Sequence, residues 1–200
     1  MNLVEIKETI QKEPVKLTPA RAMLLAVLYD LVRNGEFVSE FAGEKVCYFL
    51  QRFGAAAIFK LLYHPNFYGP YSGKVKHVLF YLNGSYLLGY SSKDKKPFEE
   101  LDLLMDTEPA VLDFLAKEEY QNERQIVEKT KAFLSGFYSN FGLELLSTLD
   151  IIIEQNKTTD LEEIKAVLAQ WSARKSKLFA NDDFLVKGLN HLKDFAQFSL

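Results

Sequence analysis

From residue 107 to its end, the sequence reads as one helix after another, and this constrains the fold more than any other feature. We expect helices at about 108–119, 122–138, 142–155, 160–171 and 182–198. A capping box of Thr159 with Glu162 is predicted to begin the fourth of these helices, and Asn181 to cap the last. This run of helices predicts a mainly α fold.

The first part of the chain adds two helices. Residues 17–35 carry helix signals at both ends, with Thr18 as N-cap, Pro19 in the first turn and Asn34-Gly35 at the end. A second helix is predicted at about 40–53, because its apolar residues follow one face. The single cysteine, Cys47, excludes a disulfide framework, and its place on that face favours a packed thiol over a nucleophile.

The segment between these two groups of helices predicts a small sheet. The run 57–68, "AIFKLLYHPNFY", is rich in aromatic and branched residues and predicts a strand that ends at a Gly69-Pro70 turn. A helix then continues to Asn83-Gly84. Segments 85–92 and 97–105 flank a polar loop and could pair as short strands, and we also expect 57–68 to form an antiparallel sheet with 97–105.

Together these patterns predict an α+β domain that is mainly α. It is expected to be compact, with about seven or eight helices and a small antiparallel β-sheet. Residues 1–16 are polar and weakly periodic, and are predicted to be a tail or linker before a single domain at 17–200.

Charge is unevenly distributed along the chain. The net charge of −3 combines +5 in residues 1–96, −11 in 97–163 and +3 in 164–200. The acidic stretch is either a surface for a partner or a set of solvated helix faces. A sequence pI of about 5.7 argues against direct nucleic-acid binding. A basic strip nevertheless leaves a winged-helix DNA-binding regulator or adaptor as an alternative; it comprises Lys74, Lys76 and His77, with Lys60 nearby.

Motifs for catalysis or cofactor binding do not appear in the sequence. There is no phosphate loop, dinucleotide fingerprint, paired-histidine motif or nucleophile elbow, and the three histidines stand far apart. We therefore expect no cofactor, no metal and no catalytic residue. No apolar run approaches the roughly 18 residues that cross a bilayer, and the first residues are too charged for a signal peptide. A cytoplasmic protein without a membrane partner is predicted.

A family resemblance extends over most of the chain. The segment 67–90, "FYGPYSGKVKHVLFYLNGSYLLGY", follows "LTPARAMLLAVL" and "EKVCYFLQRFG" and precedes "FGLELLSTLDII" and "ARKSKLFANDDFLVKGLNHLKD". These segments, in this order, resemble the Panacea-type antitoxin domain, and in particular the C-terminal, toxin-binding domain of DarG antitoxins. The resemblance implies an antitoxin that neutralises a DarT-like DNA ADP-ribosyltransferase toxin by direct binding.

The same resemblance implies that no enzyme is present. DarG-like antitoxins carry an N-terminal macrodomain that removes ADP-ribose from DNA, and only about 16 residues precede the first matching helix here. The expectation is thus a bacterial antitoxin domain without the hydrolase.

Acidic and aromatic residues are the candidates for contact with the toxin. Carboxylates beside Phe98 and Leu103 are expected to mimic the phosphates of single-stranded DNA in the toxin's groove. They are Glu99, Glu100, Asp102, Asp106 and Glu108. Tyr68 and Tyr71 form either a half-buried corner or a partner contact. The next candidates are Trp171 and Arg174, since Trp and Arg are common interface anchors.

Overall fold

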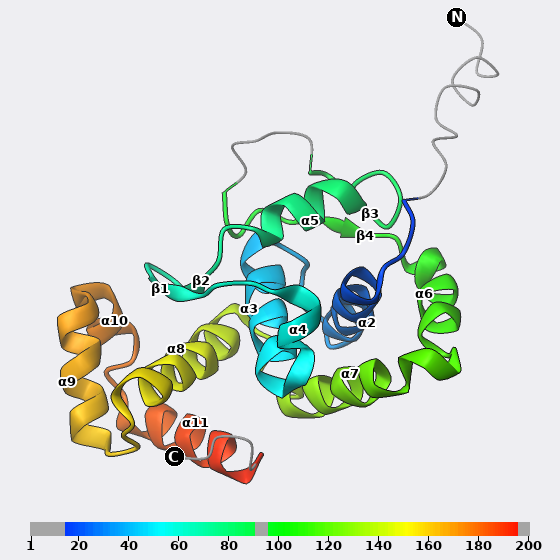
Figure 1. Cartoon of the computed structure of the whole chain (residues 1–200). Coiled ribbons are helices and arrows are strands. Elements are labelled where there is room, and N and C mark those ends of the chain that lie inside the picture. Colours follow the sequence, from blue (N-terminus) through cyan, green and yellow to red (C-terminus); the bar gives the residue numbers. More distant parts are fainter. Residues whose placement is uncertain (1–14, 91–95, 196–200) are drawn as a thin grey trace, which may run out of the picture.

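A computed structural model describes residues 15–90 and 96–195 of the chain. It is mainly helical with two small antiparallel sheets, so the predicted fold class is confirmed (Figure 1). The helices are α2 (Pro19–Arg33), α3 (Glu40–Leu50), α4 (Ala56–Phe59), α5 (Val75–Leu82), α6 (Glu108–Leu115), α7 (Gln121–Leu134), α8 (Asn140–Asn156), α9 (Leu161–Trp171), α10 (Ala173–Leu178) and α11 (Asp182–Asp194). The strands are β1 (His64–Asn66), β2 (Gly69–Tyr71), β3 (Leu87–Leu88) and β4 (Asp102–Leu103).

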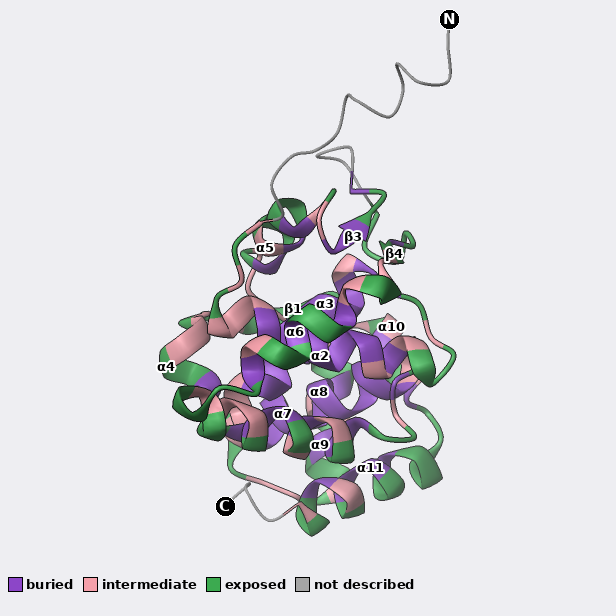
Figure 2. Ribbon diagram, turned by 90° about the vertical axis from the view of Figure 1, so that its right-hand side faces the viewer, coloured by how far each residue is buried: buried purple, intermediate pink, exposed green. Residues whose placement is uncertain are grey.

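Three helices make the centre of the molecule. α2, α3 and α8 are buried along most of their length, and the other helices surround them (Figure 2). α2 packs against α6 and α7, α3 lies between α5 and α8, and α11 covers α8. A helix that is apolar on nearly all sides can be stable in water only inside such a layer.

The N-cap residues predicted from the sequence cap their helices in the structure, with one exception. Thr18 accepts a hydrogen bond from the Arg21 amide, and Asn181 caps α11, as predicted. The predicted capping box at residues 159 and 162 is wrong, because Asp160 is the N-cap of α9 and accepts from the Glu163 amide at 3.0 Å. Asp is a preferred N-cap residue, and it stands directly before the first helical residue.

The predicted strand at 57–68 is largely a helix and a loop. After α3 the chain passes through a wide helical turn, Gln51–Ala55, with Gly54 at φ 123°, and then forms α4. The alanines at 55–57 favour helix strongly enough to outweigh the branched residues after them. Lys60 ends α4 in the left-handed conformation, and only His64–Asn66 pairs as a strand.

Strand pairing differs from the prediction in one sheet and agrees in the other. β1 pairs with β2 through Pro65 opposite Pro70, so the predicted turn at Gly69-Pro70 is wrong, and the turn lies at Phe67 and Tyr68. A two-stranded ladder tolerates these prolines because each strand has a free edge. β3 pairs with β4, which confirms the pairing of 85–92 with 97–105; the predicted pairing of 57–68 with 97–105 is wrong.

Two short helices, α4 and α10, were not predicted. α10 begins where Ser172 breaks the helical backbone and accepts from the Lys175 amide at 3.1 Å. Cys47 is buried, as predicted, and its burial raises the pKa of the thiol. Most of the predicted tail, the polar loop at 91–95 and the end of the predicted last helix lie outside the described residues. No helix in the described ranges is both long and apolar enough to cross a membrane.

Candidate functional site

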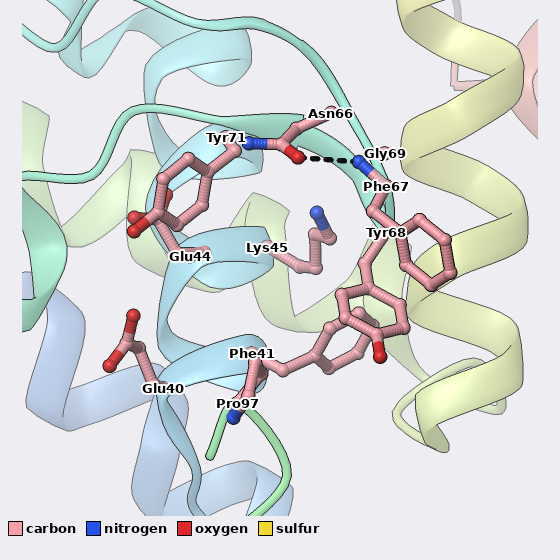
Figure 3. Close-up of a pocket in the computed structure, with 10 residues that line it drawn as sticks. All are labelled: Glu40, Phe41, Glu44, Lys45, Asn66, Phe67, Tyr68, Gly69, Tyr71 and Pro97. Atoms are coloured by element: carbon pink, nitrogen blue, oxygen red, sulfur yellow. Dashed lines mark hydrogen bonds between the residues drawn. The ribbon is translucent and has the colours of Figure 1, made fainter. Parts of the chain in front are cut away.

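A pocket of about 260 Å³ lies between the first half of α3, the β1–β2 hairpin and the loop before β4 (Figure 3). Its lining combines aromatic rings with two carboxylates and one ammonium group. The lining residues are Glu40, Phe41, Glu44, Lys45, Asn66, Phe67, Tyr68, Gly69, Tyr71 and Pro97.

The start of α3 holds one side of the pocket in place. Ser39 caps the helix by accepting from the Ala42 amide at 3.1 Å. The same turn of α3 also binds the segment that precedes β4, because the Phe41 N–H donates to the Pro97 carbonyl at 2.9 Å. The Leu101 N–H likewise donates to the Val38 carbonyl at 2.8 Å. These bonds fix residues 97–101 along the helix and close that side.

Aromatic rings from α3, from the hairpin and from residues 97–101 pack together into one wall. Phe98 lies 4.7 Å from Phe41 and 4.8 Å from Tyr68, measured between ring centroids. Phe67 meets Tyr68 edge to face at 4.8 Å, and 52% of its surface is exposed. The guanidinium group of Arg174 lies 4.9 Å from the centroid of the Tyr68 ring, so a cation stabilises the outer face of this wall.

Gly69 allows the hairpin to lie close to the core. Its φ is +98°, which other residues rarely adopt. A Cβ there would also lie 3.1 Å from Thr148 Oγ1, 3.3 Å from Ser147 Oγ and 3.4 Å from Lys45 Nζ. The pocket therefore depends on glycine at this position for its depth.

Lys45 is the cation at the base of the pocket. Its side chain is buried, and Nζ donates to the Pro70 carbonyl at 2.7 Å and lies 5.2 Å from the centroid of the Phe41 ring. Burial lowers the pKa of Lys45 to about 7, and the positive charge of Lys175 adds to this effect against the opposing charge of Glu44. A pKa of about 7 means that Lys45 gains or loses its proton near neutral pH.

Two carboxylates line the same space in different ways. Glu44 accepts from the amides of Ser72 at 3.2 Å and Gly73 at 3.1 Å, which ties the end of the hairpin to α3. Burial raises the pKa of Glu44, although the Ser72 amide and the charge of Lys45 oppose the rise. Glu40 is less buried and accepts from the Tyr90 hydroxyl at 2.9 Å. A ligand in the pocket would meet Glu40 as the more accessible hydrogen-bond acceptor.

A second buried charge cluster lies behind the hairpin. Glu144 on α8 is 3% exposed and accepts from both Arg174 nitrogens, at 2.5 and 3.0 Å, and from Lys175 Nζ at 2.7 Å. Burial alone would raise the pKa of Glu144, but the hydrogen bond from Arg174 and the charge of Lys175 outweigh it and hold the pKa below its ordinary value. Lys175 also donates to Thr148 at 2.9 Å. α8 also packs against β2, and Arg174 lies over the Phe67 and Tyr68 rings, so α8 and α10 both contact the hairpin.

The structure brings four of the predicted site residues to this hairpin. Tyr68 and Tyr71 line the pocket, and Arg174 lies over Tyr68. The Trp171 indole N–H donates to the Asn66 carbonyl at 3.2 Å. Contact residues proposed from the YGPY sequence and from the end of the chain therefore belong to one region.

The five predicted carboxylates do not form one surface of free charges. Glu99 and Glu100 are exposed beside the pocket wall, and Asp102 lies in β4. Asp106 is exposed in the turn before α6. Glu108, in contrast, is buried and forms an ion pair with Arg33.

The sequence prediction missed the residues of α3 that form the pocket. Glu40, Phe41, Glu44 and Lys45 were predicted only as part of a helix. A signal was present, because Glu44 and Lys45 are two charged residues directly before the apolar run that begins at Val46. Charged residues on a buried face usually have partners, which here come from distant segments.

Comparison with known proteins finds three similar proteins of the same name. No protein-family model matches the chain. The chain is 29% identical to a DNA ADP-ribosyl glycohydrolase of Thermus aquaticus over 165 residues, which is 82% of this chain and 44% of the relative. It is 23% identical over 182 residues to proteins of the same name from Mycobacterium tuberculosis and Mycobacterium bovis, covering 85% of this chain and 51% of each relative. The chain thus spans about half the length of the curated relatives it matches.

These names correct the expectation drawn from the family resemblance. An antitoxin domain without a hydrolase, and hence without enzymatic function, was predicted; the relatives that cover 82–85% of this chain are named for an enzyme. The alternative of a winged-helix regulator or adaptor is not supported by these names either. Over most of its length, the chain is similar to proteins named DNA ADP-ribosyl glycohydrolase.

Proposed function

We propose that this chain takes part in the removal of ADP-ribose from DNA, and that the pocket beneath the β1–β2 hairpin holds part of the modified nucleotide. The observation that carries the proposal is the similarity over 82–85% of the chain to DNA ADP-ribosyl glycohydrolases. Such a function places the chain in the bacterial cytoplasm, where its DNA substrate would be.

The pocket has the size and lining for one ring system. Its volume of about 260 Å³ is below the range that encloses drug-sized ligands, which begins at about 300 Å³. A whole ADP-ribosyl group would therefore extend beyond it. Enzymes that act on a nucleobase hold it by stacking on aromatic side chains and by hydrogen bonds to its edge. Phe41 and Tyr68 offer the rings, and Glu40 and Asn66 offer polar groups at the rim.

The charge at the base suits a ligand that carries hydrogen-bond acceptors. Lys45 is the only lysine in the pocket lining within the described residues, and its pKa of about 7 lets it offer or release a proton near neutral pH. Its ammonium group already donates to Pro70, so a ligand would share a donor that the fold holds in place.

The test compares two oligonucleotides that differ only in the modification. Fluorescence anisotropy with a labelled single-stranded DNA, with and without one ADP-ribosylated base, should show tighter binding of the modified strand. Tyr68→Ala and Glu40→Gln should each remove that preference. Leu112→Ala, which shortens an exposed side chain on α6, is the matched control and should keep it.

Release of ADP-ribose is followed in the same samples by chromatography. If the purified chain releases ADP-ribose and Glu40→Gln abolishes this release, the proposal would extend from binding to the chemical step. Equal affinity for the two strands, together with no release, would overturn the proposal.

A further inference from the structure

The outer side of α5 exposes two large rings beside two lysines. Phe80 and Tyr81 are 54% and 61% exposed. Lys74 and Lys76 precede them and are also exposed, whereas the inner side of the helix is packed into the core. These four residues are called the α5 face below. Because the helix is already packed on its inner side, the exposed rings are apolar surface that the fold does not require.

The outer side of α6, with the turn before it, combines apolar side chains with acidic ones. Met105 and Leu112 are 39% and 45% exposed. Asp106 and Asp113 follow them directly in the sequence and are exposed as well. These four residues are called the α6 face. It resembles the α5 face in having exposed apolar groups, and differs from it in the sign of its charge.

The charges of the two faces are not used inside the chain. Within residues 15–90 and 96–195, no ion pair involves Lys74, Lys76, Asp106 or Asp113. The contrast extends along the sequence, because residues 45–93 contain no Asp or Glu, whereas residues 97–163 carry a net charge of −11. A surface with complementary charge for each face is therefore present on the chain itself.

The α5 face also has a hollow that an apolar side chain could enter. It has a volume of about 420 Å³ and is lined by Lys76, His77, Phe80 and Tyr90. The Phe80 and Tyr90 rings lie 6.2 Å apart, measured between their centroids. Energetically important residues of protein interfaces are commonly aromatic and lie in such hollows.

The two faces lie near the same end of the fold. In Figure 1 the β3–β4 sheet lies between α5 and α6. Both helices also adjoin α2: α6 packs against it, and the guanidinium group of Arg21 on α2 lies 5.6 Å from the centroid of the Tyr81 ring. One interface can therefore include both faces.

We propose that two copies of this chain form a two-fold symmetric dimer, in which the α5 face of each copy docks on the α6 face of the other. A two-fold axis makes this contact twice and closes the assembly at two copies. Two contacts also help to reach the roughly 800 Å² per partner that stable interfaces bury. Pairing of one α5 face with another would instead bring like charges together, which costs affinity.

Sedimentation equilibrium of the purified chain measures the dimer directly. At about 100 μM protein, above the micromolar dissociation constants of the weaker standard-sized interfaces, the mass should approach twice 23.0 kDa. An increase from about 0.1 M to about 1 M salt shortens the screening length from about 10 Å to about 3 Å and should raise the dissociation constant of the dimer. Phe80→Ala should raise it by about 30-fold, as expected for loss of an anchor residue.

Exchange of charge between the two faces is the sharper test. Lys76→Glu and Asp113→Lys should each raise the dissociation constant by about tenfold or more, because each places like charges at both contacts. An equimolar mixture of the two variants should dimerise again. In the mixed dimer, one contact has both charges exchanged and the other contact is unchanged. A variant that had merely lost its fold could not recover in this way.

α11 provides matched controls. It exposes Phe184 and Lys187, and Phe184→Ala and Lys187→Glu should leave the dimer unchanged. Thermal melts of all variants confirm folding. A monomeric mass for the unsubstituted chain at the protein concentration given above, no recovery in the mixture, or equal losses in the α5 and α11 variants would each overturn the proposal. None of these measurements includes DNA, so their result is independent of the function proposed for the pocket.

Discussion

Removing the charge of Glu144 should destabilise the fold more than any other single change of charge discussed above. Glu144→Gln keeps the side chain's size but leaves Arg174 and the fully buried Lys175 without their counter-charge. Removal of one partner from a buried pair costs about 3–5 kcal/mol. Because Arg174 is 32% exposed and retains some solvation, we expect the lower end, about 3 kcal/mol.

Urea denaturation followed by circular dichroism measures this loss. The midpoint should fall while the slope of the free energy of unfolding against urea stays constant. The melting temperature should fall by about 6–12 °C for a chain of this size. Glu162→Gln, which removes the carboxylate of an exposed ion pair with Lys165, is the control and should change the free energy of unfolding by less than about 1 kcal/mol.

A second substitution separates the charge effect from a general loss of packing. Lys175→Met in the Glu144→Gln background removes one unpaired buried cation, so the double variant should be more stable than Glu144→Gln alone. A loss below about 1 kcal/mol for Glu144→Gln, or a double variant less stable than the single one, would refute this account of the cluster.

Two further outcomes follow from the hairpin and from Lys45. Gly69→Ala should lower the free energy of unfolding, measured by urea denaturation, by about 2 kcal/mol and weaken binding to ADP-ribosylated DNA. Gly84 has a similar φ of +86° but open space for a Cβ, so Gly84→Ala should lower the free energy of unfolding less and leave binding intact. Equal effects of the two substitutions would contradict the close approach of the hairpin to the core. Since the pKa of Lys45 is lowered from 10.5 to about 7 in the folded state, the unfolded chain binds more protons between these values. The free energy of unfolding should therefore rise with pH from about 7 up to 10.0, the ordinary pKa of tyrosine, above which tyrosines also ionise. Lys45→Met should flatten this rise. An identical pH profile in the wild-type protein and in Lys45→Met would contradict the burial of the ammonium group.

The parts of the fold that local sequence determines were predictable. α2 has its cap, its proline and its terminal Asn-Gly within one short segment, and the later helices repeat this kind of information. The strand predicted at 57–68 was wrong at α4, because the prediction gave the branched and aromatic residues more weight than the helix preference of the alanines before them. The strand ladder at Pro70 is possible only because both of its strands are edges.

The candidate site depends on contacts that spacing cannot reveal. Glu44 and Lys45 are neighbours in the sequence, but Glu44 binds the amides of residues 72 and 73, and Lys45 binds the carbonyl of Pro70. Burial is the main cause of the lowered pKa of Lys45, and the charge that adds to it comes from Lys175, far along the chain.

The connection between α8 and α10 has a consequence for dividing the chain into shorter pieces. A fragment that stops at Lys157 would keep every pocket-lining residue, yet it would lose both cations that neutralise Glu144. The carboxylate would then lie buried on α8 without any of its hydrogen bonds from α10. We therefore expect α10 to unfold together with the pocket, so a boundary drawn for expression belongs after α10 rather than after α8.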